Sequence, residues 1–219
     1  MVHGKTDVIN LKGKSIHFYG SVYGLTSEIS EVHRAFKNAR PEVVALPIPE
    51  EELEGLKAIS DGEDVKIELS RYEEIYARNL ALFGEVRVPP PSLVEAFEIC
   101  KEKSIPIVAI DMDDYDYTTT YINNITTMQL LRHSIRVKRL RKKKFRSSNP
   151  VDFAFEWDKT VNKLKGFKVL EMRREEYMAE RLVELADEHS RILAVVELPR
   201  MEGILRKVKE SLLDTENKN

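Results

Sequence analysis

The chain has 219 residues and a formal net charge of −2, with 42% hydrophobic and 33% charged residues. These values predict a folded protein with a sizeable core and exclude an intrinsically disordered chain. The single cysteine, Cys100, excludes an internal disulfide. The first residues lack the apolar core of a signal peptide, and no apolar run approaches the roughly 18 residues of a membrane span. We therefore expect a cytoplasmic protein.

Strands and helices alternate along most of the chain. Short apolar runs predict strands at residues 15–19, 43–46, 105–110 and 191–198. Apolar residues at helical spacing predict helices at 27–40, 70–82, 92–103, around 177–184 and at 204–213. Two capping boxes, Ser70 with Glu73 and Ser92 with Glu95, mark the starts of two of these helices.

This alternation predicts an α/β fold with a mainly parallel central sheet flanked by helices. We treat residues 1–219 as one domain. Ligand sites in such sheets lie at the carboxyl ends of the strands. The segments expected there are residues 20–24, 47–50, 111–116 and 197–203.

Residues 118–166 break the alternation and predict a helical insertion within the domain. Apolar residues recur at helical spacing over 122–135 and again over 153–164. Between these stripes, Pro150 is well placed to start the second helix, and Gly166 is placed to end it. The sequence therefore predicts two helices joined by a short break.

The insertion can complete its core in two ways. Two helices alone have a thin core, so the same unit of a second subunit could cover them in a two-fold dimer. The insertion could instead fold back over the strand ends as a lid. We favour a homodimer through the insertion, with Trp157 in the interface.

Three stretches resemble the TraB/PrgY/Tiki-like family in order and approximate spacing. They are Phe18 to Ser27, Arg40 to Leu46, and Glu176 to Val196. The family is related in fold to erythromycin esterase and ChaN-like proteins. What the resemblance implies is a metal-dependent hydrolase built from two Gly-x-x-His motifs and a glutamate, in which imidazoles bind a divalent metal.

This chain departs from that motif set at all three chemical positions. Gly20 is kept, but Tyr23 stands where the family has the first histidine. Pro47 replaces the glutamate, and Arg200 replaces the second histidine. A phenol is a poor metal ligand near neutral pH, a proline side chain cannot coordinate, and an arginine carries a permanent cation. The sequence therefore assigns no catalytic residues.

Two aspartates offer a substitute site. Asp111 and Asp113 follow a predicted strand, at the place of the family's two aspartates, and their carboxylates could hold Mg²⁺ or Ca²⁺. The alternative is a solvated turn in which one aspartate caps the next helix. Arg174 matches an arginine of the family and could form an ion pair with either aspartate. With Gly20, Tyr23 and Arg200, these residues form the predicted ligand-binding set.

A basic segment is the strongest local feature. Residues 117–151 contain no Asp or Glu, and nine Lys and Arg lie within 132–146. We expect this segment to be one basic helix that either forms a solvated or self-pairing face or binds a polyanion such as nucleic acid. The candidate polyanion-binding residues are Arg136, Lys138, Arg139, Arg141, Lys142, Lys143 and Lys144.

These features favour a catalytically degenerate TraB-like protein that binds a partner or ligand, with no cofactor. One alternative is a metal-dependent hydrolase whose rebuilt site combines Asp111, Asp113, Arg200 and Tyr23. The other alternative is polyanion or nucleic-acid binding through residues 132–146. The first alternative requires its four side chains to converge at one edge of the sheet.

Overall fold

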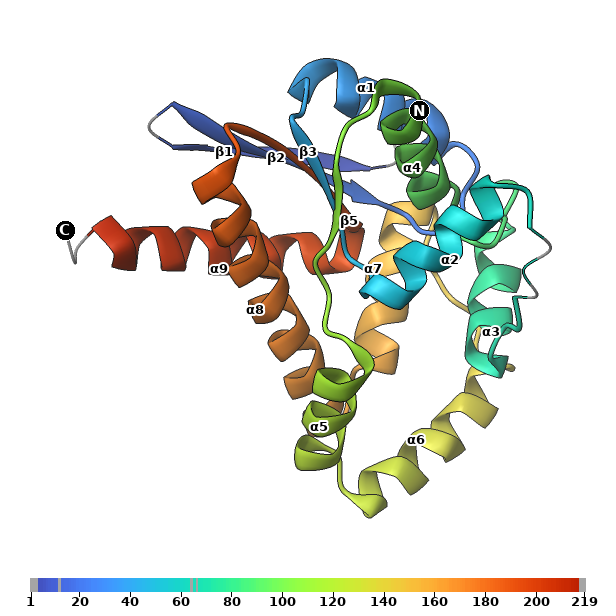
Figure 1. Cartoon of the computed structure of the whole chain (residues 1–219). Helices are drawn as coiled ribbons and strands as arrows, with labels where there is room; N and C mark the ends of the chain where they lie inside the picture. Colours follow the sequence, from blue (N-terminus) through green and yellow to red (C-terminus); the bar gives the residue numbers. More distant parts are fainter. Residues whose placement is uncertain (1–3, 12, 64, 66, 217–219) are drawn as a thin grey trace.

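The computed structural model describes residues 4–11, 13–63, 65 and 67–216 (Figure 1). The described residues form a five-stranded sheet with the strand order β1-β2-β5-β3-β4. β1 pairs with β2 in the antiparallel sense, and the other neighbours pair in parallel. The strands are β1 (Lys5–Leu11), β2 (Lys14–Ser21), β3 (Val43–Leu46), β4 (Ile107–Ala109) and β5 (Arg191–Glu197).

Helices flank this sheet, which confirms the predicted α/β fold with a mainly parallel sheet. The helices before the insertion are α1 (Glu28–Ala39), α2 (Glu50–Ser60), α3 (Arg71–Leu80) and α4 (Pro91–Lys103). The later helices are α5 (Asp114–Asn124), α6 (Thr127–Leu140), α7 (Pro150–Val161), α8 (Lys165–Glu188) and α9 (Leu198–Glu216).

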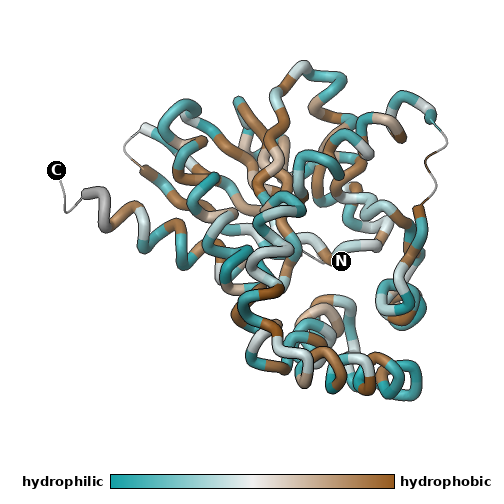
Figure 2. The backbone as a smooth tube through the Cα atoms, turned by 60° about the horizontal axis from the view of Figure 1, so that its bottom comes forward, coloured by the Kyte–Doolittle hydropathy of each residue, from teal (hydrophilic) through white to brown (hydrophobic). Residues whose placement is uncertain are grey.

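The central strand β5 shows how the sheet separates two cores. Successive side chains of a strand point to opposite faces. Ile192 and Ala194 pack in the cluster formed with α8 and α9, whereas Leu193 and Val195 pack in the cluster formed with α1 and α4. Hydrophobic segments accordingly gather in the strands, between helices whose colour alternates along their length (Figure 2). Helices cover both faces of the sheet, so both sets of side chains of β3 and β5 are buried, which explains why these strands are continuous apolar runs.

Several local predictions are confirmed. The capping box of Ser70 and Glu73 opens α3, with the Glu73 amide donating to the Ser70 hydroxyl and the Ser70 amide donating to the Glu73 carboxylate. Pro150 is the first residue of α7. Cys100 is buried in α4, and burial raises the pKa of its thiol to about 12, so it is a small core residue and not a nucleophile.

Other local predictions are wrong. Ser92 forms no capping box, because α4 begins one residue earlier, at Pro91, and the Ser92 hydroxyl is buried without a partner among the described residues. Gly166 does not end α7; it lies in the first turn of α8, where a Cβ would come within 2.4 Å of the Asn124 carbonyl oxygen. β1 and α2 were not predicted at all.

The insertion departs most from the expected helix pair. α5 ends at Asn124, and the chain is extended at Ile125 before α6 begins, so the predicted stripe over 122–135 is split. Ile125 is buried against Phe167 and Leu170 of α8. Leu131, in the middle of α6, is 57% exposed.

The apolar stripe of α7 is buried within its own chain. Phe153 and Trp157 pack in a third core cluster at the strand ends, together with Ile75 of α3 and Leu198 of α9. Trp157 is only 5% exposed. α7 therefore covers the strand ends as the lid alternative requires, and Trp157 is not available for an interface between subunits.

No helix in the described part of the chain is both long enough and apolar enough to cross a lipid bilayer.

Gly20 permits a close approach between β2 and the start of α9. A Cβ at this position would lie 2.7 Å from the Sδ of Met201 and 2.9 Å from a methyl carbon of Leu198. Contacts of this kind are shorter than van der Waals distances, so a larger side chain here must move the start of α9.

We therefore expect Gly20→Ala to lower the free energy of unfolding by roughly 1–3 kcal/mol, measured by urea denaturation. Gly55→Ala is the matched control, because Gly55 lies within α2 and a Cβ there meets nothing within 4 Å. That change should be neutral or stabilising, since alanine favours a helix over glycine. Equal unfolding curves for the two variants would contradict this packing role.

Candidate functional site

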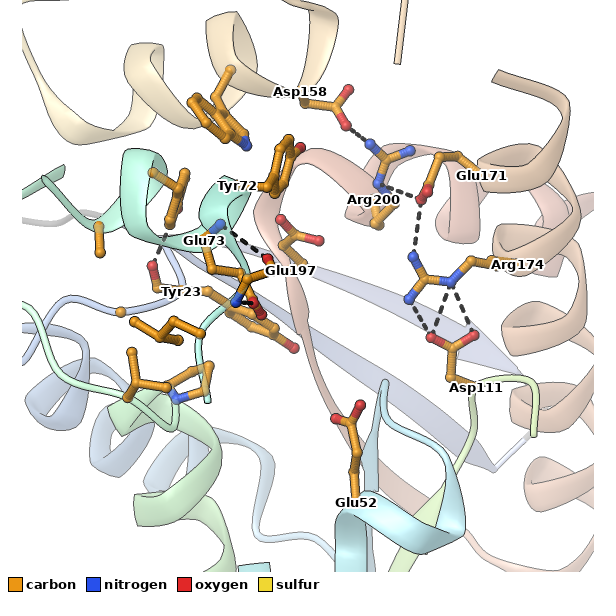
Figure 3. Close-up of a pocket in the computed structure, with 18 of the residues that line it drawn as sticks. Tyr23, Glu52, Tyr72, Glu73, Asp111, Asp158, Glu171, Arg174, Glu197 and Arg200 are labelled. Atoms are coloured by element: carbon orange, nitrogen blue, oxygen red, sulfur yellow. Dashed lines mark hydrogen bonds and ion pairs between the residues drawn. The ribbon is translucent and has the colours of Figure 1, made fainter. Parts of the chain in front are cut away.

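A cavity of about 630 Å³ lies at the carboxyl edge of the sheet. Its lining comes from segments that are far apart in the sequence (Figure 3). The loops and strand ends contribute Tyr23, Asp111 and Glu197. The helices contribute Glu52, Tyr72, Tyr76, Trp157, Asp158, Glu171, Arg174 and Arg200. The cavity lies where the topology of a parallel sheet places ligand sites.

Arg174 of α8 holds the loop after β4. Its Nε lies 3.3 Å and 3.2 Å from the two carboxylate oxygens of Asp111, and its Nη2 donates to the second oxygen. The Met112 amide donates to the first oxygen of Asp111 at 2.8 Å. Both oxygens of this buried carboxylate are therefore occupied. The ion pair predicted between Arg174 and Asp111 is confirmed.

Arg200, in the first turn of α9, extends the same network. Arg174 Nη1 donates to Glu171 at 3.1 Å, and Arg200 Nε lies 3.5 Å from the same Glu171 oxygen. The other nitrogens of Arg200 pair with Asp158 of α7 and, at 3.1 Å, with Glu175. Arg200 is only 7% exposed. Figure 3 shows this chain of ion pairs along one wall of the cavity.

Gly203 makes room for this network. A Cβ at Gly203 would lie 2.0 Å from a carboxylate oxygen of Glu175. The glycine therefore lets α9 approach α8 closely enough for Glu175 to reach Arg200.

Glu197 is a lining carboxylate outside this network. It is the last residue of β5, and among the described residues its carboxylate has no hydrogen bond or ion pair. Burial raises the pKa of its carboxyl to about 7, and the nearby carboxylates of Glu171 and Asp111 act in the same direction, against Arg174. A carboxyl of this kind exchanges its proton near neutral pH.

Aromatic side chains form the wall opposite the ion pairs. The ring centroid of Trp157 lies 4.8 Å from that of Tyr72 and 5.3 Å from that of Tyr76. The Tyr76 hydroxyl donates to the backbone oxygen of Tyr23 at 3.1 Å. The hydroxyl of Tyr23 is buried and has no partner in the described structure, and burial and Glu197 raise its pKa well above the usual value.

The structure brings together four of the six predicted ligand-binding residues. Tyr23, Asp111, Arg174 and Arg200 all line the cavity. Gly20 does not, because it is buried against Met201 and Leu198. Asp113 does not either.

Asp111 and Asp113 do not form a pair of free metal ligands. Arg174 occupies Asp111, and Asp113 caps α5 by accepting a hydrogen bond from the Asp116 amide at 2.8 Å. Across residues 4–11, 13–63, 65 and 67–216, no group of three or more His, Cys, Asp or Glu side chains is arranged to hold a metal ion. The residues present therefore do not fit the divalent cation that the sequence suggested at this turn.

Sequence reasoning missed most of the residues that line the cavity. Glu197 lies in the segment 197–203 that was expected at the strand ends, but it was not included in the predicted ligand-binding set; its place directly after the buried run of β5 could have identified it. Glu171 and Tyr72 carry no such local mark, since their positions depend on how α8 and α3 pack. Trp157 was placed in a subunit interface and instead lines the cavity.

The basic segment is not one helix over 132–146. α6 ends at Leu140, and the following residues form a turn and an irregular loop, so Arg141, Lys142, Lys143 and Lys144 are not helical. Lys143 is partly buried and pairs with Glu156 at 3.0 Å. Arg136 is also partly buried. The candidates that remain exposed are Lys138, Arg139, Arg141, Lys142 and Lys144.

No protein-family model matches this sequence, and no curated protein matches it either. The resemblance to the TraB/PrgY/Tiki-like family therefore stays a prediction that rests on the three short stretches.

The environment of Glu197 predicts a pH-dependent stability. Its pKa is about 7 in the folded chain and 4.5 in the reference state, so between these pH values the folded chain binds more protons than the unfolded chain. The contribution of Glu197 to the free energy of unfolding therefore falls as the pH rises from about 5 to about 7.

We compare the change in the free energy of unfolding that Glu197→Gln causes at pH 8 with the change that it causes at pH 5. The change at pH 8 should be more stabilising, by on the order of 1–3 kcal/mol. Urea denaturation at the two pH values measures the difference. Glu54→Gln, an exposed position on α2, is the control and should give the same small change at both. An equal effect of Glu197→Gln at pH 5 and pH 8 would show that Glu197 ionises normally.

Proposed function

We propose that this protein is a catalytically degenerate TraB-like protein, a binding or regulatory module that holds a ligand in the cavity at the strand ends. The main observation behind this proposal is that charged side chains of the cavity are already paired with other side chains of the protein. Asp111, Arg174 and Arg200 are engaged with one another or with Glu171, Glu175 and Asp158. Groups committed to internal ion pairs stabilise the walls of a site more readily than they take part in a reaction.

The positions that carry the family resemblance support the same reading. Tyr23 and Arg200 line the cavity where the resemblance implies two imidazoles. Pro47 is buried just after β3 and offers no coordinating side chain. A cavity with a preformed aromatic wall and few free polar groups is typical of small-molecule sites. We place the protein in the cytoplasm, because its only cysteine is a buried free thiol.

The alternative of a hydrolase with a rebuilt site has partial support. Tyr23, Asp111 and Arg200 do converge at one sheet edge. Asp113 faces its own helix end instead, and Arg200 has no free donor pair for an anionic substrate. A substrate anion would have to displace carboxylates that are already in place.

Binding of a polyanion is a second alternative, favoured by the exposed basic residues at the end of α6. Lys138, Arg139, Arg141, Lys142 and Lys144 are exposed on neighbouring turns. They cannot form the single helical stripe that the sequence suggested, because the helix ends at Leu140. This surface is separate from the cavity and is compatible with a ligand there.

We also propose a homodimer through α6. Its exposed apolar residues are Met128, Leu131 and Ile135, which recur on one helical face. Figure 1 shows α6 at the outer edge of the molecule, so a second subunit has access to it. Covering this face would remove apolar side chains from water.

A test of the proposed function compares metal content and turnover. Protein purified without chelator should contain no stoichiometric transition metal and should show no metal-dependent peptidase or esterase activity, because the described residues include no group of three or more side chains arranged to hold a metal ion. Asp111→Ala should then lower stability by about 3–5 kcal/mol, since it leaves Arg174 without its main partner in a buried site. Stoichiometric metal, with turnover abolished by Asp111→Ala, would sink the proposal.

The dimer is tested at α6 and not at Trp157. Sedimentation at micromolar protein should show a dimer. Leu131→Asp should raise the dissociation constant of the dimer at least tenfold, so that the variant sediments as a monomer. The variant should keep the unfolding behaviour of the monomer, because Leu131 is exposed in a single chain. Trp157→Asp does not discriminate, since it disrupts the core of each subunit. A monomer at every concentration would rule the dimer out.

A further inference from the structure

We infer that the cavity binds an organic cation, an ammonium or guanidinium group carried on an apolar body. This inference rests on the proposed function and specifies the chemical class of its ligand. It depends on three features of the cavity: the charge that is left unpaired, the aromatic wall, and a buried hydroxyl without a partner.

The arginines of the cavity are not available to an anion. Arg87 lines the cavity and pairs at 2.7 Å with Glu85, which is not part of the lining. Arg174 is held by Asp111 and Glu171, and Arg200 by three carboxylates. Acidic side chains in the lining outnumber these arginines by seven to three. The positive charges of the cavity are therefore neutralised within the protein, and the net charge of the lining is negative.

Four lining carboxylates have no ion pair in the described structure. Glu73 caps α3 and Asp114 is exposed in the first turn of α5, which leaves Glu197 and Glu52. Glu197 lies at the end of β5, inside the cavity, and Glu52 lies on α2, exposed at its rim. Desolvation raises the pKa of both carboxyls, and the Asp111 carboxylate acts in the same direction on each. A bound cation would offset this unfavourable charge, because the attraction between opposite charges strengthens where water is excluded.

The titratable groups that interact electrostatically with Glu197 come from several elements. They are Asp111 from the loop after β4, Glu171 and Arg174 from α8, and Tyr23 from the turn after β2. Tyr72 and Tyr76 of α3 also lie within its electrostatic influence. Arg174 is the one cation among them, and it is shared by Asp111 and Glu171. Glu197 is therefore left with a surplus of negative charge around it.

The aromatic wall suits the body and the charge of such a ligand. Tyr72 and Trp157 line the cavity together with Tyr76 and Tyr23. The faces of aromatic rings attract cations, by about 0.5–2 kcal/mol in proteins. The buried oxygen of Tyr23 has no partner in the described structure and can accept a hydrogen bond from an N–H group. Figure 3 shows Tyr23, Tyr72 and Glu52 around the open space that faces the ion pairs.

The single tryptophan provides a direct readout. Trp157 is the only tryptophan of the chain, and it lines the cavity. Its fluorescence can be titrated with three compounds that share a phenyl body and differ in charge: 2-phenylethylammonium, 2-phenylethanol and 3-phenylpropanoate. Agmatine, which carries a guanidinium group, serves as a second cation of different shape. Isothermal calorimetry measures the same affinities independently.

We expect 2-phenylethylammonium to bind at least tenfold more tightly than 2-phenylethanol, with no binding of 3-phenylpropanoate. Glu197→Gln should weaken the cation at least tenfold and leave the neutral compound unchanged. Glu54→Gln, on α2 but outside the lining, should bind as the unmodified chain does. Because Glu197→Gln keeps the size of the side chain, its unfolding curve identifies any loss of binding that is due to misfolding.

The outcomes separate this inference from the proposed function. Equal or tighter binding of 2-phenylethanol or 3-phenylpropanoate overturns the cation inference and leaves a ligand-binding cavity. Binding of the cation that Glu197→Gln does not alter also overturns it, as does a failure of both cations to bind. Metal-dependent turnover overturns the proposed function instead, whichever compound binds.

Discussion

A chain of buried ion pairs, from Asp111 through Arg174 and Glu171 to Arg200, holds the carboxyl edge of the sheet in place. It joins the loop after β4, the middle of α8 and the start of α9, and Asp158 adds α7. Removing one partner of such a pair leaves a buried charge uncompensated, which costs about 3–5 kcal/mol. The position of four separate segments therefore depends on charges that must all be present together.

The same constraint decides which chemistry the edge can offer. Because both arginines are shared among carboxylates, neither is free to bind an anion, and Asp111 is not free to bind a cation. Glu197, at the end of the central strand, takes no part in these ion pairs. The network thus forms one wall of the cavity, and Glu197 lines the cavity outside it, together with aromatic side chains. This arrangement is the basis of our inference that the ligand is a cation.

The sequence predicted the parts of the fold that show a recognisable local pattern, such as an apolar run or a helix cap. Strands β3 and β5 are continuous apolar runs, and the capping box at Ser70 fixes the start of α3. β1 was missed because it is an exposed edge strand in which Ile9 alone is fully buried, and α2 because it buries Leu56 alone. In the cavity, the pairing of Asp111 with Arg174 was predictable from the family resemblance. The pairing of Arg200 was not, since its partners lie on two other helices, α7 and α8, and the local sequence does not show how these helices pack.

The place of β5 in the sheet has a consequence for how the molecule assembles. β5 is the last strand along the chain but lies between β2 and β3, whose residues pair with it from more than a hundred positions away. The β1–β2 pair and the β3–β4 pair are joined in one sheet only when β5 arrives between them. Contacts of such long sequence separation slow folding. Glu197 enters the cavity in that same step. A ligand bound there would therefore be held only by chains that have completed their sheet, and it would favour them over every partly folded form.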